Sequence, residues 1–99
     1  MAAKAYVVSM NKFRDNADHR RYELDAPEGG SFADYRDVGG VRQILHVETA
    51  PKARGLGYAA RLMDGVVEDA RANGRKITPF CSYAQAYFVR NKSAADVLG

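Results

Sequence analysis

Residues 41–63 read VRQILHVETAPKARGLGYAARLM and place a β-prone run, a basic glycine turn and the start of an amphipathic helix in direct succession. The run at residues 41–49 is the longest and most apolar strand candidate in the chain. A period of two puts Val41, Gln43, Leu45, Val47 and Thr49 on one face, and Arg42, Ile44, His46 and Glu48 on the other. Apolar residues on both faces predict a central strand.

The helix after the turn is the clearest element of the chain. Its apolar residues recur at helical spacing, at Leu56, Ala59, Ala60, Met63, Val66, Val67 and Ala70. Asn73-Gly74 ends it. Gly65 inside it costs about 1 kcal/mol relative to alanine, so we expect close packing against another backbone there. A short strand over residues 75–80 and a helix over residues 82–91 complete this half.

The first half of the chain predicts short strands over residues 6–10, 19–24 and 32–38, with a polar loop over residues 11–18. Glycine pairs at 29–30 and 39–40 suit tight antiparallel turns. The expected fold class is α+β, with a three-layer-like α/β arrangement. It has a mixed sheet of about five strands, an antiparallel N-terminal part and one right-handed parallel βαβ crossover. Residues 1–99 are expected to form a single domain.

Composition excludes several classes of protein. The 99 residues include one cysteine, so an internal disulfide framework is excluded. No apolar run approaches the roughly 20 residues that span a bilayer, which predicts no membrane association. The N-terminal apolar patch is too short for a signal peptide, and we expect a cytoplasmic protein. The net charge of +3 is mild and indicates an anionic partner without specifying nucleic acid.

The turn Gly55-Leu56-Gly57 lies between a strand and a helix, where glycine lets backbone N–H groups converge on an anion. Lys52 and Arg54 add positive charge, and residues 49–63 contain no Asp or Glu. A tight turn without a ligand is the alternative interpretation. A dinucleotide fold would need an acidic residue about 20 positions later, and a P-loop would need Gly-Lys-Ser/Thr. The sequence has neither, so a phosphate site of another kind is favoured.

Lys52-x-x-Gly55-x-Gly57 resembles the motif Q/R-x-x-G-x-G/A of the GNAT acetyltransferases, with Lys52 in place of the usual Gln or Arg. A closer resemblance, to a short GNAT subfamily, covers most of the chain. Its pattern, roughly H-T-x-V, R-G-x-G-x-A and P-x-C-[SP]-Y, is matched in order by residues 46–49, 54–59 and 79–83. The residues after His46 depart from that pattern.

The resemblance implies that acetyl-coenzyme A is the co-substrate. In this superfamily the turn binds the pyrophosphate and the preceding strand lines up with the pantetheine arm. The implied binding residues are Val47, Thr49, Arg54, Gly55, Leu56, Gly57, Tyr58 and Ala59. Arg90, Asn91 and Lys92 are candidates for the 3′-phosphate, with a solvated helix end as the alternative. His19, His46 and Cys81 show no paired ligand spacing, so no metal site is predicted.

Acetyl transfer to an amine needs a base, because a lysine-like amine has a pKa near 10.4. Glu48 and His46 are candidates, with a structural ion pair or hydrogen bond as the alternative. Cys81, with His46 as its base, could carry an acetyl-cysteine intermediate, or be an inert thiol. The resemblance implies that a tyrosine protonates the departing sulfur, here Tyr83 or Tyr87; their spacing also fits a packing stripe.

The sequence therefore predicts an acetyl-CoA-dependent N-acetyltransferase acting on an unidentified amine, by direct attack or through Cys81. A non-catalytic coenzyme A-binding module is the second hypothesis. A small basic nucleic-acid-binding domain ranks third, because the chain lacks the aromatic-interleaved basic sheet of RNA-binding domains.

Overall fold

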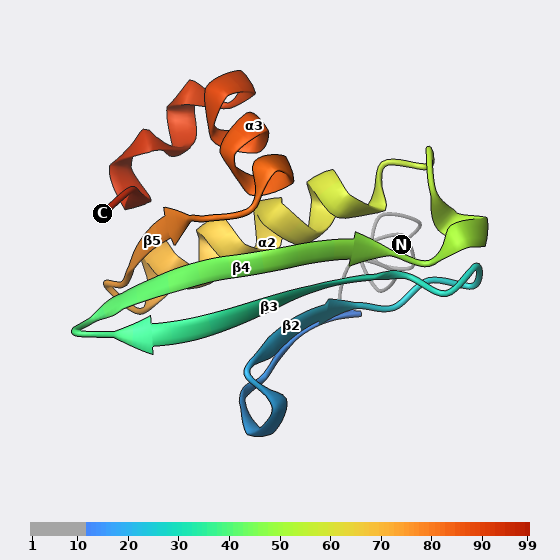
Figure 1. The fold of residues 1–99 in the computed structure, drawn as a ribbon, viewed down its shortest axis with the longest axis horizontal. Coiled ribbons are helices and arrows are strands. Elements are labelled where there is room, and N and C mark those ends of the chain that lie inside the picture. Colours follow the sequence, from blue (N-terminus) through green and yellow to red (C-terminus); the bar gives the residue numbers. More distant parts are fainter. Residues whose placement is uncertain (1–11) are drawn as a thin grey trace, which may run out of the picture.

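The computed structural model describes residues 12–99 and contains one mixed five-stranded sheet (Figure 1). The strands are β1 (Phe13–Asn16), β2 (Arg21–Leu24), β3 (Ser31–Val38), β4 (Val41–Thr49) and β5 (Lys76–Pro79). They lie in chain order across the sheet. The first four pair antiparallel, and β5 is parallel to β4. This arrangement confirms the predicted fold class.

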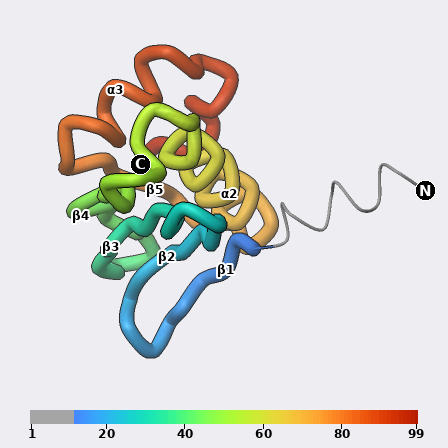
Figure 2. Tube along the Cα trace, turned by 90° about the vertical axis from the view of Figure 1, so that its right-hand side faces the viewer, coloured from blue at the N-terminus to red at the C-terminus, as the bar shows by residue number. Residues whose placement is uncertain are grey.

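The helices are α2 (Tyr58–Ala72) and α3 (Ser82–Arg90), with short 3₁₀ turns η1 (Ala17–His19), η2 (Pro51–Ala53) and η3 (Lys92–Val97). Helix α2 connects β4 to β5 and packs against β2 to β5, while α3 contacts β4, β5 and α2. Figure 2 shows α2 on one side of the sheet and α3 above the β4–β5 end. None of the helices in residues 12–99 is long and apolar enough to cross a membrane.

The core lies between α2 and the sheet. Its largest fully buried side chains are Tyr22, Ile44, Leu62, Met63, Ile77 and Val66. The apolar stripe predicted for α2 supplies Met63, Val66 and Val67, which confirms that face of the helix. Leu62, placed between the stripe positions, is also fully buried, whereas Leu56 is 48% exposed and precedes the helix.

The polar segment at residues 11–18 is not a loop, because β1 occupies its centre. Phe13 stacks on Tyr22 with ring centroids 5.5 Å apart, and Arg14 forms ion pairs with Glu23 and Asp25 on or beside β2. These partners are distant in sequence, so the local composition gave no strand signal. The strand predicted over residues 6–10 lies outside the described residues.

Gly65 of α2 faces a side chain rather than a backbone. A Cβ atom built there would lie 2.6 Å from two ring carbons of Phe13. The absence of a side chain at Gly65 therefore lets β1 approach the helix, which is a different reason for this glycine from the close backbone contact that the sequence suggested.

The strict alternation predicted for β4 is wrong, because a β-bulge interrupts it. Asp34 of β3 pairs with His46, but the next residue, Tyr35, pairs with Ile44, so Leu45 is an extra residue. Ile44 therefore faces the core before the bulge, and Val47 packs against the core after it. A bulge reverses the face that alternate residues occupy.

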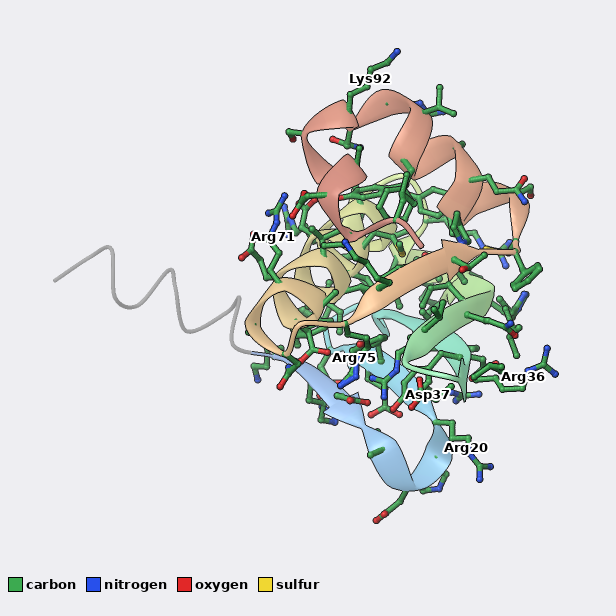
Figure 3. The ribbon with its side chains drawn as sticks, turned by 90° about the vertical axis from the view of Figure 1, so that its left-hand side faces the viewer. Arg20, Arg36, Asp37, Arg71, Arg75 and Lys92 are labelled. Atoms are coloured by element: carbon green, nitrogen blue, oxygen red, sulfur yellow. The ribbon has the colours of Figure 1, made fainter. Side chains whose placement is uncertain are left out.

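Arg42 is buried at the end of the sheet where β4 begins, with 5% of its surface exposed. Its guanidinium lies 3.7 Å from the Tyr35 ring centroid and donates to Asp37, Asp15 and the Tyr22 hydroxyl. Figure 3 shows Asp37 and Arg75 near each other at this end, while Arg20 and Arg36 point outward. The buried charge is thus paired and hydrogen bonded, as burial requires.

Candidate active site

Strands β4 and β5 part half-way along β4. Their pairing runs from Val41–Lys76 to Ile44–Pro79. Both Phe80 N and Cys81 N then donate to Ile44 O, at 2.9 and 3.3 Å. The remaining residues of β4, 45–49, continue without a β5 partner in the described part of the chain. An unpaired strand edge with free N–H and C=O groups can hydrogen bond to an extended ligand.

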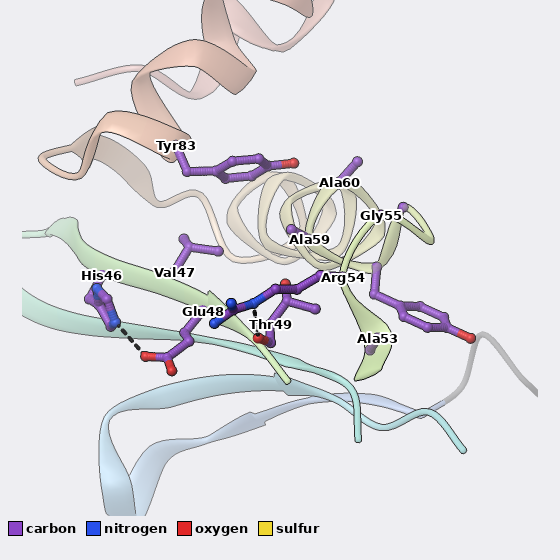
Figure 4. A pocket seen from close by; sticks show the side chains of 12 residues that line it. His46, Val47, Glu48, Thr49, Ala53, Arg54, Gly55, Ala59, Ala60 and Tyr83 are labelled. Atoms are coloured by element: carbon purple, nitrogen blue, oxygen red, sulfur yellow. Dashed lines mark hydrogen bonds and ion pairs between the residues drawn. The ribbon is translucent and has the colours of Figure 1, made fainter. Parts of the chain in front are cut away.

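A cavity of about 660 Å³ lies beside this unpaired edge (Figure 4). Its lining comes from the end of β4, the glycine turn, the first turn of α2 and one side chain of α3. The residues are His46, Val47, Glu48, Thr49, Ala53, Arg54, Gly55, Gly57, Tyr58, Ala59, Ala60 and Tyr83. A cavity of this size is within the range of small-molecule and cofactor sites.

The glycine turn is shaped to admit a ligand. Gly55 and Gly57 have φ angles of +80° and +84°, which L side chains rarely adopt, and a Cβ atom at either would meet no atom within 4 Å. Arg61 is the first residue of α2 whose N–H has a backbone acceptor among the described residues, Gly57 O at 3.2 Å. The preceding N–H groups and the acid-free first turn favour an anion.

Two basic side chains accompany the turn. Arg54 is exposed, lines the cavity, and donates from Nε to Thr49 O at 3.2 Å, which ties the turn to the end of β4. Lys52 is exposed but is not among the lining residues. Arg54 is therefore the basic side chain that this geometry places at the cavity.

His46 and Glu48 are brought together at the cavity. His46 Nε2 lies 2.9 Å from Glu48 Oε1, and their side chains are 55% and 48% exposed. The His46 ring also meets the Phe32 ring edge-on, with centroids 6.2 Å apart. Alternation along β4 puts both residues on the sheet face opposite Val47, and the bulge at Leu45 makes this the face away from the core. A carboxylate and an imidazole in contact can accept and pass on a proton.

Cys81 is not joined to His46. Its Sγ accepts a hydrogen bond from Ala84 N at 3.3 Å and caps the first turn of α3. Cys81 is half-buried against the core and is absent from the cavity lining among the described residues. The structure thus gives this thiol a capping contact in place of the imidazole partner expected of a nucleophile.

Tyr83 and Tyr87 have different surroundings. Tyr83 lines the cavity, and burial raises its pKa above the ordinary value. Tyr87 is buried and donates its hydroxyl hydrogen to Asp64 Oδ1 at 2.6 Å. Burial, together with this contact, raises the pKa of Tyr87 as well. Of the two, Tyr83 is the one that lines the cavity together with Glu48 and the glycine turn.

Some of the other residues proposed from the sequence line the cavity and some do not. Val47, Thr49, Tyr58 and Ala59 line the cavity with the two glycines, whereas Leu56 does not. None of Arg90, Asn91 and Lys92 lines it, and Asn91 instead borders a second cavity of about 200 Å³ next to α2. Among residues 12–99, no three His, Cys, Asp or Glu side chains are grouped as a metal site.

Three residues at or near this site escaped the sequence analysis. Ala53 and Ala60 line the cavity. Ala60 lies three positions after Gly57, about one helical turn, and this spacing is a local signal that it faces the same side as the glycine turn. Glu28, from the turn between β2 and β3, accepts a hydrogen bond from the Tyr58 hydroxyl at 2.9 Å. Glu28 is 30 residues away in sequence, so no local pattern indicates this contact.

Comparisons with known proteins agree with this geometry. The family model of the GCN5-related N-acetyl-transferases matches residues 21–97. A GCN5-like N-acetyltransferase candidate from Staphylococcus aureus is 25% identical with a TM-score of 0.64, and the match covers 88% of this chain and 86% of that one.

A second similar structure is the ribosomal-protein-S18-alanine N-acetyltransferase of Escherichia coli, at 12% identity and a TM-score of 0.59. The match covers 88% of this chain but 57% of that one, and it shows the shared fold. The narrower resemblance to a short subfamily stays a prediction from the motifs. With the family model matched from β2 to η3, the chain belongs to the GCN5-related N-acetyltransferase family.

Proposed function

We propose that this chain is an acetyl-CoA-dependent N-acetyltransferase that transfers an acetyl group to a primary amine. The observation that carries the proposal is the cavity, which joins a glycine turn suited to an anion to a carboxylate–imidazole pair and a tyrosine hydroxyl. Family membership supplies the reaction class. The residues present fit the co-substrate, because the open space beside both glycines leaves room for a diphosphate.

Acetyl-CoA, when bound, supplies a thioester whose carbonyl carbon an amine nitrogen can attack. The N–H groups of the turn and the first turn of α2, with Arg54, would hold its diphosphate. The unpaired edge of β4 at residues 45–49 would hydrogen bond to its amide-containing arm. Binding would thus use backbone groups that the fold leaves free.

Glu48 would take the proton of the attacking ammonium group at Oε2, because Oε1 faces His46 Nε2. His46 would orient that carboxylate. Tyr83 Oη would give a proton to the departing sulfur, since a phenol carries its proton at neutral pH. The N–C bond would form as the C–S bond breaks, and the second proton lost by the nitrogen would restore the Tyr83 hydroxyl, which yields an N-acetyl amine and coenzyme A. Direct attack fits the capping contact of Cys81 better than an acetyl-cysteine route.

The test is acetyl-CoA binding, measured by isothermal titration calorimetry, in Gly57→Val and in Gly40→Val. Gly40 is a matched control, since its φ is +82°, a Cβ there meets no atom within 4 Å, and it lies in the turn between β3 and β4. Both variants carry the same backbone strain, but only valine at position 57 would fill the ligand space. We expect at least about tenfold weaker binding in Gly57→Val alone.

Equal loss of affinity in the two variants would contradict the site assignment. Coenzyme A release in the presence of amines separates an enzyme from a binding module. Tight acetyl-CoA binding without coenzyme A release for any amine would favour the non-catalytic alternative.

A further inference from the structure

Two exposed apolar side chains flank the point where β4 and β5 part. Leu45, the extra residue of the bulge, is 38% exposed, and Phe80 is 53% exposed. The backbone of Phe80 is fixed on both sides, because its N–H donates to Ile44 O and its carbonyl accepts from Gln85 Nε2 at 3.3 Å. A phenyl ring held in solvent on an anchored backbone is the kind of feature that marks a contact surface.

The described helices leave one face of the sheet bare (Figure 2). Register places Phe32, Glu48, Asp34 and His46 on one face, opposite the face of Ala33 that packs under α2. Figure 2 shows α2 on only one side of β2, β3 and β4. A molecule from solvent can therefore reach Glu48 from the bare face, while the acetyl donor is held from the side of the glycine turn.

The charge on this face suits an ammonium group. Asp34 is paired with Arg21 at 2.8 Å, and Glu23 is paired with Arg14 at 2.6 Å. Glu48 is half-exposed, and among the described residues its one ion-pair partner is His46. Glu48, whose ion-pair partner is an imidazole and not a guanidinium, follows Leu45 by three residues on the same strand.

We propose that the acceptor is a small primary amine carrying an apolar group, of the arylalkylamine or branched alkylamine class. Its ammonium meets Glu48, and its apolar group contacts Phe80 and Leu45. This inference rests on the proposed function, because Glu48 is the proton acceptor there. The ammonium loses one proton to Glu48, its nitrogen forms the amide bond as the C–S bond breaks, and the sulfur leaves with the proton of Tyr83. The second proton that the nitrogen loses restores the Tyr83 hydroxyl.

The experiment compares kcat/KM for 2-phenylethylamine, isoamylamine, ethanolamine and putrescine, in the unaltered chain and in Phe80→Ala. Val89→Ala is the control, since Val89 is 70% exposed on α3 and away from the cavity lining. We expect kcat/KM to be about tenfold or more higher for the two apolar amines. Phe80→Ala should remove most of that preference through KM and leave the Kd of acetyl-CoA unchanged; Val89→Ala should retain both.

A second measurement is independent of turnover. Saturation-transfer difference NMR should show contact between the chain and the ring protons of 2-phenylethylamine, reduced in Phe80→Ala and retained in Val89→Ala. Equal or reversed amine selectivity, or selectivity unchanged in Phe80→Ala, would overturn the inference and leave the proposed function standing. Acetyl-CoA binding without turnover of any of the four amines would overturn it too. Failure to bind acetyl-CoA would instead refute the proposed function.

Discussion

Tyr83 and Tyr87 stand four residues apart on α3, yet only Tyr83 has a hydroxyl group available to the cavity. Replacing Tyr83 by phenylalanine removes the proposed proton donor and keeps the ring. We expect kcat to fall by about 100-fold with little change in the Kd of acetyl-CoA. Tyr87→Phe is the matched control. It loses the hydrogen bond to Asp64, which should lower the free energy of unfolding by about 1 kcal/mol without a comparable effect on kcat. Similar kcat values for the two variants would remove Tyr83 from the mechanism.

Cys81 provides the second test at the scale of a single residue. Its sulfur caps α3 through Ala84 N at 3.3 Å, so serine should replace it with a hydroxyl acceptor of similar reach. We expect Cys81→Ser to keep most of the activity, and Cys81→Ala to lose about 0.5–1 kcal/mol of stability because the cap is lost. Intact mass after incubation with acetyl-CoA should show no acetyl group on the unaltered chain. An acetyl adduct that disappears in Cys81→Ser, together with lost turnover, would restore the acetyl-cysteine route.

Among the elements, β4 joins the two ends of the molecule. Its first half carries Arg42 into a buried network with Asp37, Asp15 and Tyr22. Arg42→Met should lower the free energy of unfolding by about 3 kcal/mol, because Asp15 loses its ion-pair partner and the Tyr22 hydroxyl oxygen loses its donor. Arg36→Met is the control, since exposed Arg36 donates to Gln43 and should cost under about 1 kcal/mol. Urea unfolding measures both, and equal losses would show that the network contributes little.

The same strand shows what the sequence could and could not predict. Its length and its place before a glycine turn follow from residues 41–57, where apolar content and glycine spacing are local properties. The bulge at Leu45 does not, because it depends on the register of Tyr35 against Ile44 across the hairpin. Without the bulge, Val47 and Glu48 would exchange faces. The proximity of His46 to Glu48 was predictable from a spacing of two, but the cavity beside them was not.

Strand β1 gives the complementary case. Its residues FRDN carry little strand propensity, and only contacts made by the folded chain explain it. Phe13 stacks on Tyr22 and fills the space at Gly65. The candidate site likewise has parts that the sequence predicts and parts that it does not. The glycine turn can be predicted from its motif. The capping contact of Cys81 and the contact of Glu28 with Tyr58 depend on how the folded chain places these residues.

At the scale of the whole molecule, the tyrosines connect folding to pH. Five tyrosines in the described residues have a raised pKa: Tyr22, Tyr35, Tyr58, Tyr83 and Tyr87. Burial is the main cause in all of them except Tyr58, where the hydrogen bond to Glu28 comes first. Tyr22 and Tyr35 are held further by Asp69 and Asp15, which accept from their hydroxyl groups. The core is therefore built around phenols that must stay protonated.

The free energy of unfolding falls or rises with pH according to whether the folded or the unfolded chain binds more protons. The unfolded chain loses tyrosine protons near the ordinary pKa of 10.0, whereas the folded chain retains them to higher pH. The unfolded state then binds fewer protons, so stability is complete below about pH 10 and falls as pH rises further. We expect about 1.4 kcal/mol of loss per pH unit for each tyrosine protonated only in the folded state. Urea unfolding at about pH 8 and about pH 11, with tyrosinate absorbance recorded in both states, measures the loss. If the free energy of unfolding is the same at both pH values, the buried phenols do not have the raised pKa values that their surroundings indicate.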